Sequence, residues 1–155
     1  VPFMSEYKES SPYLPGLALP APAPDGVDAP FWQGAREGSL VLQRCQHCAL
    51  FQTPPEWICH RCHSFDVEWA EVAGHGKVYS WMRVHNPSHP ALTQKVPYLV
   101  VVVEVLTANN VKLLGNLLGD PNQPVAIGDA VTAVFEHHEE ATLVQWRRLP
   151  ETQSQ

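Results

Sequence analysis

The stretch Arg44-Cys45-Gln46-His47-Cys48 and the stretch Cys59-His60-Arg61-Cys62 decide how this chain folds. Together they contain all four cysteines, as two C-x2-C pairs with ten residues between them. Each pair predicts a tight turn that directs two thiolates toward one point, and the segment between the pairs should fold back as a hairpin-like arm. Two such hooks at this separation predict a zinc ribbon, with four ligands: Cys45, Cys48, Cys59 and Cys62.

The ligand set predicts a structural metal site. Four thiolates satisfy the tetrahedral preference of Zn²⁺ and leave no open position for a substrate. A rubredoxin-type iron centre uses similar hooks, so iron stays open as the metal. Two disulfides would need an oxidising compartment, and a redox C-x2-C usually occurs once. His47, His60 and His63 lie within or beside the hooks and are interpreted as flanking residues.

The composition restricts the class of protein. With 155 residues and 45% hydrophobic content, the chain can build a true core. Its formal net charge of −6 argues against a sequence-independent nucleic-acid binder, which needs a basic face. The longest apolar run, residues 98–103, is far below the roughly 18 residues that span a bilayer. No secretory signal is evident, so we expect a cytoplasmic protein with reduced cysteines and no membrane contact.

We expect four segments along the chain. A proline-rich N-terminal arm covers residues 1–27 and should be irregular and extended. A helix and the zinc ribbon follow over 28–66, an OB-fold barrel over 67–150, and a short tail over 151–155. The predicted fold class is therefore mainly β, with an N-terminal helix, a rubredoxin-like ribbon and a small barrel.

The helix is predicted over residues 28–38. Asp28 suits the N-cap and Gly38 suits the C-terminal position. Phe31 and Trp32 share one face and are expected to dock on the rest of the protein. A contact with a ligand or partner is the alternative for these two aromatic residues.

The rest of the chain has the pattern of β-structure. After a strand at 39–45 and an irregular arm at 49–58, the expected strands are 67–72, 77–84, 97–106, 111–118, 130–137 and 142–148. Gly74-His75-Gly76 and Asn109-Asn110 are expected to form turns. Five or six strands without helices between them exclude a βαβ architecture and suit a closed barrel of OB type.

The long loop at residues 85–97 is a candidate binding element, because loops at a barrel mouth commonly carry binding residues. Its prolines limit its freedom, so less entropy is lost on docking. It has histidines but no carboxylate to orient them, so catalysis by this chain is not expected. The predicted contact residues are His85, Asn86, Pro87, His89, Pro90 and Tyr98, together with Phe31 and Trp32.

Other chemistry is weakly indicated. No nucleophile elbow, phosphate-binding loop or H-E-x-x-H motif occurs. Tyr79, Trp81 and Arg83 alternate along one predicted strand, so they should share a face that could bind single-stranded nucleic acid. The acidic net charge counts against that function, and packing in a core or interface is the preferred interpretation for Tyr79 and Trp81.

An ordered set of short motifs covers residues 28–148. They are Phe31-Trp32-x-Gly-x-x-Glu37-Gly38, residues 40–48, Pro54-Pro55, the second hook, Gly74-x-Gly76-x-Val78-Tyr79-Ser80, Pro97-Tyr98 and Ile127-Gly128-Asp129. In this order, the chain resembles the rubredoxin-like zinc-ribbon plus OB-fold proteins first classed as domain of unknown function thirty-five. Each motif alone is weak, whereas the ordered set is specific.

This resemblance implies a function. Proteins of that family accompany thiolase-like enzymes, including retro-aldolases that cleave steroid side chains as CoA thioesters, and acyltransferases. The implied role is a non-catalytic subunit that docks on a thiolase-like aldolase, in a hetero-oligomer that binds acyl-CoA. The alternatives are a subunit of an acyltransferase or CoA hydratase complex, a single-stranded nucleic-acid-binding OB protein, and an acyl-CoA carrier or hydrolase acting alone. Cations that could meet a CoA phosphate are Arg36, Arg44, Arg61, Lys77 and Arg83.

Overall fold

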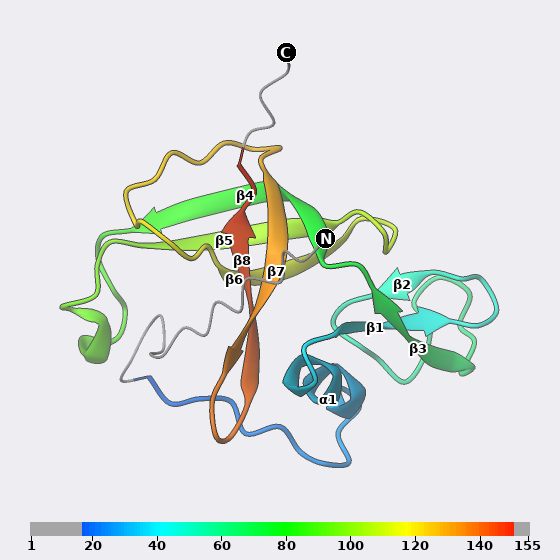
Figure 1. The fold of residues 1–155 in the computed structure, drawn as a ribbon. Coiled ribbons are helices and arrows are strands. Elements are labelled where there is room, and N and C mark those ends of the chain that lie inside the picture. Colours follow the sequence, from blue (N-terminus) through cyan, green and yellow to red (C-terminus); the bar gives the residue numbers. More distant parts are fainter. Residues whose placement is uncertain (1–16, 151–155) are drawn as a thin grey trace, which may run out of the picture.

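The computed structural model describes residues 17–150, which form a ribbon, one helix and a barrel (Figure 1). Most of the predicted arm, residues 1–16, and the predicted tail at 151–155 lie outside the described residues. The elements are α1 (Ala29–Arg36), β1 (Leu40–Cys45), β2 (Phe51–Gln52), β3 (Val67–Val72), β4 (His75–Val84), η1 (Pro90–Leu92), β5 (Tyr98–Val105), β6 (Val111–Asn116), β7 (Ala130–His137) and β8 (Thr142–Arg148). No helix in this part of the chain has the length and apolar run needed to cross a bilayer.

The ribbon contains a three-stranded antiparallel sheet in the order β2-β1-β3. Strand β1 ends at Cys45, so the sheet carries the chain directly into the first hook. Cys45 pairs with Val67 and Leu40 with Val72, so β3 returns along the whole of β1. Strand β3, predicted to leave the ribbon for the barrel, is thus hydrogen-bonded as a ribbon strand. Strand β2 lies in the arm that the sequence predicts as irregular.

The barrel is a five-stranded antiparallel sheet in the order β6-β5-β4-β7-β8. A parallel bridge between Leu117 and Trp146 brings its two edges together, so the barrel is nearly closed. Along β5 every second side chain is buried, as expected for a strand with one face on a core. Val101, Val103 and Trp146 are fully buried in that core. The predicted mainly β fold, with ribbon before barrel, is confirmed.

The predicted turn at residues 74–76 is wrong, because β4 already begins at His75. Gly76 pairs with Val105 in β5 and with Val131 in β7. A Cβ atom at Gly76 would collide with the Val103 side chain and the backbone of Glu104. The glycine is therefore explained by close approach of strands and not by a turn.

The expected common face of Tyr79, Trp81 and Arg83 is also wrong. A β-bulge between Val78 and Ser80 interrupts the alternation at Tyr79. Tyr79 is 49% exposed, whereas Trp81 packs against the buried core with Arg83 over its ring. Core packing is thus confirmed for Trp81 but not for Tyr79. Tyr79 and Trp81 therefore do not form one aligned aromatic face on β4.

Helix α1 lies between the ribbon and the barrel (Figure 1). It contacts β1 as well as β7 and β8, and Ala35 is fully buried against them. Asp28 stands at the predicted N-cap position but makes no capping hydrogen bond with its side chain. Gly38 has φ of +80°, the left-handed conformation in which a helix commonly ends.

Candidate metal centre and partner-binding surfaces

The four cysteines converge as the sequence predicts. Their sulfur atoms all lie within 4.8 Å of one another. The Sγ atoms of Cys45 and Cys62 are 3.5 Å apart, and those of Cys48 and Cys59 are 3.6 Å apart. All four are free thiols in the structure, so the disulfide alternative does not apply. Each short pair joins a cysteine of one hook to a cysteine of the other.

The two hooks have the same backbone geometry. The amide of Ala49 donates to Cys45 O at 2.9 Å, and that of His63 donates to Cys59 O at 2.9 Å. Ala49 and His63 have φ of 60° and 61°, so each hook closes with a residue in the left-handed region. This conformation is costly for residues other than glycine. In each hook this unfavourable conformation closes the turn that directs two sulfur atoms to one point.

A pair of buried glutamines positions the second hook. Gln52 Nε2 donates to Gln43 Oε1 at 2.7 Å, and both residues are 2% exposed. Gln43 also bonds the backbone of Glu56, with Nε2 donating to its carbonyl and Oε1 accepting from its amide. Gln52 Nε2 donates to Ile58 O, and its Oε1 accepts from the His60 amide. These bonds hold the backbone on both sides of Cys59.

The sulfur cluster fits a tetrahedral metal ion. A Zn–S bond of about 2.3 Å places the sulfur atoms of a tetrahedral site about 3.8 Å apart. The observed separations of 3.5 and 3.6 Å are close to that value. Four thiolates would hold Zn²⁺ and leave no coordination position for a substrate. Iron in a rubredoxin-type centre takes the same four-thiolate shell, so the geometry does not select between the two metals.

The electrostatics of the second hook also suit a metal. The backbone N–H groups of Cys62 and Arg61 lower the pKa of the Cys59 thiol to about 6, which favours the thiolate. For Cys62, the Ser64 amide favours the thiolate, but burial and the neighbouring sulfur atoms raise its pKa to about 12. The raised pKa of Cys62 favours its protonated form, so binding of a metal ion at this sulfur releases a proton.

The residues around the cluster are flanking groups. His47, His60 and His63 are exposed. Among the residues that the structure describes, the metal-binding group consists of the four cysteine sulfur atoms. Arg44 forms an ion pair with Glu68 of β3 and lies over the Phe51 ring. Its charge is therefore partly neutralised within the ribbon sheet.

Phe31 and Trp32 line a cleft where α1, the ribbon and β6 meet. Their rings contact edge to face, with centroids 5.3 Å apart. Both are half-buried, and Trp32 Nε1 donates to Asp28 Oδ2 at 2.8 Å. The cleft has a volume of about 190 Å³. These two predicted contact residues are therefore at a concave and mainly apolar surface.

The loop at 85–97 lies on the other side of the barrel from the ribbon (Figure 1). His85, Asn86 and Pro90 are exposed, and Pro87 is half-buried. His89 Nδ1 accepts from the Ala91 amide, so its ring caps the short helix η1. Tyr98 is 9% exposed, so little of its side chain is accessible to a partner in this structure. The structure thus brings the loop residues together and keeps them away from Phe31 and Trp32.

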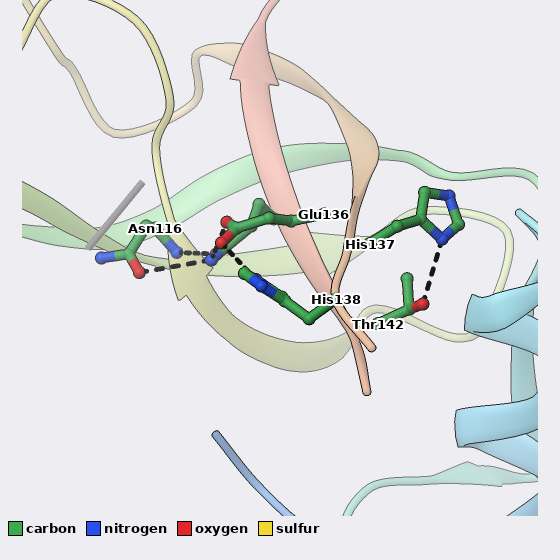
Figure 2. Close-up of polar contacts among 6 residues, drawn as sticks. Asn116, Glu136, His137, His138 and Thr142 are labelled. Carbon is green, nitrogen blue, oxygen red and sulfur yellow. Dashed lines mark hydrogen bonds and ion pairs between the residues drawn. The ribbon is translucent and has the colours of Figure 1, made fainter. Parts of the chain in front are cut away.

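A polar cluster at the barrel seam was not anticipated from the sequence (Figure 2). Glu136 is 7% exposed, with Oε1 2.7 Å from His138 Nε2 and Oε2 3.1 Å from Gln145 Nε2. Gln145 Oε1 accepts from the Asn116 amide at 2.7 Å. The cluster links β6, β7 and β8 where the barrel closes. Because Asn116 and Gln145 are 29 residues apart, no local pattern could have indicated the contact.

The cations considered for CoA phosphates differ in whether their side chains are already bonded within the fold. Arg83 donates to Pro121 O at 2.9 Å and to Gln123 O at 2.6 Å, and so fixes the connection before β7. Arg44 is paired with Glu68. Arg36, Arg61 and Lys77 are exposed.

In a comparison with known protein families, two family models match adjacent parts of the chain. A model described as "ChsH2, rubredoxin-like zinc ribbon domain" matches residues 32–68. A model described as "ChsH2, C-terminal OB-fold domain" matches residues 69–136. The two matches meet between Glu68 and Trp69, inside β3.

Two curated relatives extend beyond this chain. A probable enoyl-CoA hydratase alpha subunit of Thermomonospora curvata is 34% identical over 154 residues, covering 98% of this chain and 47% of its own length. The 3-oxo-4,17-pregnadiene-20-carboxyl-CoA hydratase alpha subunit of Mycobacterium tuberculosis is 30% identical over 129 residues, covering 83% and 40%. The chain thus spans about half the length of the curated relatives it matches.

Two solved structures are similar. A chain of the "Ltp2-ChsH2(DUF35) aldolase" is 35% identical, with a TM-score of 0.71, and the match covers 84% of this chain and 98% of that one. A protein of unknown function from the DUF35 family of Sulfolobus solfataricus is 14% identical, with a TM-score of 0.58 over 81% of this chain and 87% of that one. The second match shows the fold alone.

Proposed function

Because the chain belongs to the ChsH2 family of zinc-ribbon and OB-fold proteins, we propose that it is a non-catalytic accessory subunit of an acyl-CoA-processing complex. A thiolase-like aldolase supplies the catalytic residues, and this chain docks on it. The substrate is a steroid whose side chain is a CoA thioester, and a retro-aldol reaction cleaves that side chain. The observation that carries this proposal is the match to the aldolase chain over 98% of its length.

The chemistry of the described residues supports a non-catalytic role. All four cysteines belong to one metal-binding cluster with no open ligand position, so no thiol is left for acyl transfer. The ring nitrogen Nδ1 of His89 accepts from the backbone within its own loop. Glu136 is engaged by His138 and Gln145 at the barrel seam. The four thiols, His89 and Glu136 thus have structural roles.

The metal is a structural cofactor in this proposal, zinc with iron as the alternative. It holds the two hooks and, through them, the arm at 49–58 that packs beside α1 and β6. Reduced cysteines of this kind fit a cytoplasmic complex. The metal takes no part in the reaction, because its four positions belong to cysteine sulfur.

The loop at 85–97 is the part of the chain that we expect at the partner's active-site entrance. It presents His85 and Asn86 to solvent, while the side chain of Leu92 is buried, at 3% exposure, and anchors the loop. An anchored loop loses little entropy on docking. Replacing residues 86–95 by a Gly-Ser linker would also remove Leu92, so separate substitutions of exposed and buried residues make the sharper test.

A second function is favoured by the curated relatives. Two of them are named as CoA hydratase alpha subunits, and this chain matches about half of each. The same ribbon and barrel could therefore serve a hydratase complex, or an acyltransferase complex of the thiolase type. In both cases the role of the chain is the same, and only the partner's chemistry differs.

The test is copurification after coexpression with a thiolase-like subunit, to be sought among the genes next to this one. We expect a hetero-oligomer that cleaves a 3-hydroxyacyl-CoA with a steroid side chain into a ketone and a shorter CoA thioester. Hydration of the corresponding enoyl-CoA without cleavage would assign the hydratase role. Copurification of nucleic acid with salt-dependent affinity, or turnover by the isolated chain, would overturn the accessory role.

A further inference from the structure

The four cysteines form two close pairs that run between the hooks. Cys45 Sγ lies 3.5 Å from Cys62 Sγ. Cys48 Sγ lies 3.6 Å from Cys59 Sγ. The paired residues are 17 and 11 positions apart in the chain, so each pair joins the first hook to the second. The fold therefore arranges the four sulfur atoms both as a shell for a metal ion and as two cross-hook pairs.

Each pair combines an accessible sulfur atom with a buried one. Cys45 and Cys59 are 1% and 0% exposed, whereas Cys48 and Cys62 are half-buried. An oxidant in the solvent therefore meets one member of each pair before the other, since oxidation of cysteine follows exposure. The second member lies directly behind it, where a resolving thiol is needed.

The buried member of each pair is the one that the backbone holds in place. Cys45 is the last residue of β1, and its amide donates to Leu50 O at 2.9 Å. The Cys59 amide donates to Ser64 O at 2.9 Å, and the buried glutamine pair bonds the backbone on both sides of this cysteine. None of these bonds involves sulfur. The two buried sulfur atoms are thus positioned by the fold and not by an ion alone.

We propose that the ribbon is a peroxide-responsive switch, in which oxidation releases the metal ion and forms the disulfides Cys45–Cys62 and Cys48–Cys59. The accessible thiolate of each pair attacks one oxygen of hydrogen peroxide, which gives a sulfenic acid and hydroxide. The buried thiolate then attacks that sulfur, forms the S–S bond and displaces a second hydroxide. In total, four thiolates lose four electrons and two peroxide molecules become four hydroxide ions. Because the thiolate is the metal ligand, the four cysteines then no longer hold a dication.

The cross-hook pairing decides what happens to the ribbon after the ion is lost. Disulfides within one hook would leave the two hooks without a covalent connection. Disulfides between the hooks replace the connection that a shared metal ion provides. They also close longer loops, which restrict the unfolded chain more strongly. We therefore expect the oxidised ribbon to stay folded without metal and to take up its ion again on reduction.

Disulfide mapping tests the pairing on the zinc-loaded, full-length chain titrated with hydrogen peroxide. We expect the disulfides Cys45–Cys62 and Cys48–Cys59, with one zinc ion released for about every two peroxide molecules consumed. A colorimetric zinc indicator follows the release. Reduction by a dithiol in the presence of zinc should restore the loaded form. Disulfides within the hooks, sulfinic acid without disulfides, or no zinc uptake after reduction would each overturn the proposal.

Two serine variants test the pairs one at a time. In Cys45→Ser, peroxide should join Cys48 to Cys59 and leave Cys62 as a free thiol. In Cys48→Ser, it should join Cys45 to Cys62 and leave Cys59 free. A bond between Cys59 and Cys62 in either variant would show that pairing follows the hooks, and would overturn the proposal. If a variant does not fold, the wild-type map decides the pairing.

Hydrogen exchange compares the two metal-free states. Amides of residues 45–62 in the oxidised chain should exchange within about threefold of their zinc-loaded rate, and in the reduced metal-free chain at least about tenfold faster. Equal exchange in the two metal-free states would overturn the switch, because the disulfides would then not hold the ribbon. None of these measurements needs the thiolase-like subunit, so their outcome is independent of the proposed function.

Discussion

Gln43 and Gln52 lie directly opposite each other on β1 and β2, and Gln52 Nε2 donates to Gln43 Oε1 at 2.7 Å. Both side chains are buried, and together they bond the backbone of residues 56, 58 and 60. The second cysteine hook is thus held by side-chain amides and not by its sulfur atoms alone. The position of Cys59 depends on two uncharged residues nine positions apart.

Replacing Gln43 by leucine should lower the free energy of unfolding by about 2–4 kcal/mol, because it leaves several buried polar groups without partners. Chemical denaturation of the metal-loaded protein measures the change. Gln46→Leu is the control, since Gln46 is exposed in the first hook and should change stability by about 0.5 kcal/mol or less. Equal effects of the two substitutions would contradict the role of the pair.

Ala49→Gly should stabilise the metal-loaded protein by about 0.5–1 kcal/mol, because Ala49 has φ of 60° and glycine adopts this conformation without steric cost. His63→Gly, at the same position of the other hook, should have the same sign. A comparison of thermal unfolding midpoints measures both. Destabilisation by both variants would show that the left-handed residues are not strained.

Metal analysis should find one ion per chain, bound by the four cysteines. Cys62→Ser or treatment with a chelator should remove it and increase hydrogen exchange throughout residues 45–62. Amides of β5 should stay protected, because this strand is hydrogen-bonded to β4 and β6 and not to the ribbon. Unchanged exchange in the ribbon after metal loss would contradict a structural role for the ion.

Gln145→Leu should destabilise the barrel by about 1–3 kcal/mol, because it removes the hydrogen bonds that the Gln145 side chain makes to the buried Asn116 amide and to the Glu136 carboxylate. Urea denaturation provides the measurement. Glu140→Gln in the exposed β7–β8 turn serves as the control and should be nearly neutral. A neutral result for Gln145→Leu would mean that the seam cluster does not stabilise the barrel.

The loop at 85–97 combines an anchor with an exposed surface, and the two can be separated. Leu92→Ala should cost about 2–5 kcal/mol, because Leu92 is almost fully buried. The double substitution His85→Ala and Asn86→Ala should leave stability unchanged and lower turnover of the complex. Unchanged turnover would remove the loop from the partner's active-site entrance.

Features that depend on short spacing could be predicted from the sequence. The two C-x2-C hooks predict the metal-binding cluster, because each tight turn brings its own two cysteines together. The alternation of apolar and polar residues predicts the strands, and the strands at 130–137 and 142–148 are observed at the predicted bounds. Asn109 and Asn110 have φ of 54° and 56°, as the turn prediction requires.

Features that depend on distant partners could not be predicted. The bulge at Tyr79 follows from how β4 pairs with β5. The sequence predicts a turn at Gly76 because it does not show that strands approach closely there. The seam cluster joins residues from three strands. The cleft at Phe31 and Trp32 exists only because α1, the ribbon and β6 come together, so its shape is a property of the fold.

The central claim is that this chain acts only as part of a complex whose catalyst is its partner. The direct measurement is retro-aldol turnover of a steroid side-chain CoA thioester by the purified thiolase-like subunit, titrated with this chain. We predict no turnover by this chain alone and turnover that rises with added chain until a fixed stoichiometry is reached. Full turnover by the thiolase-like subunit without this chain, or turnover by this chain alone, would contradict the account.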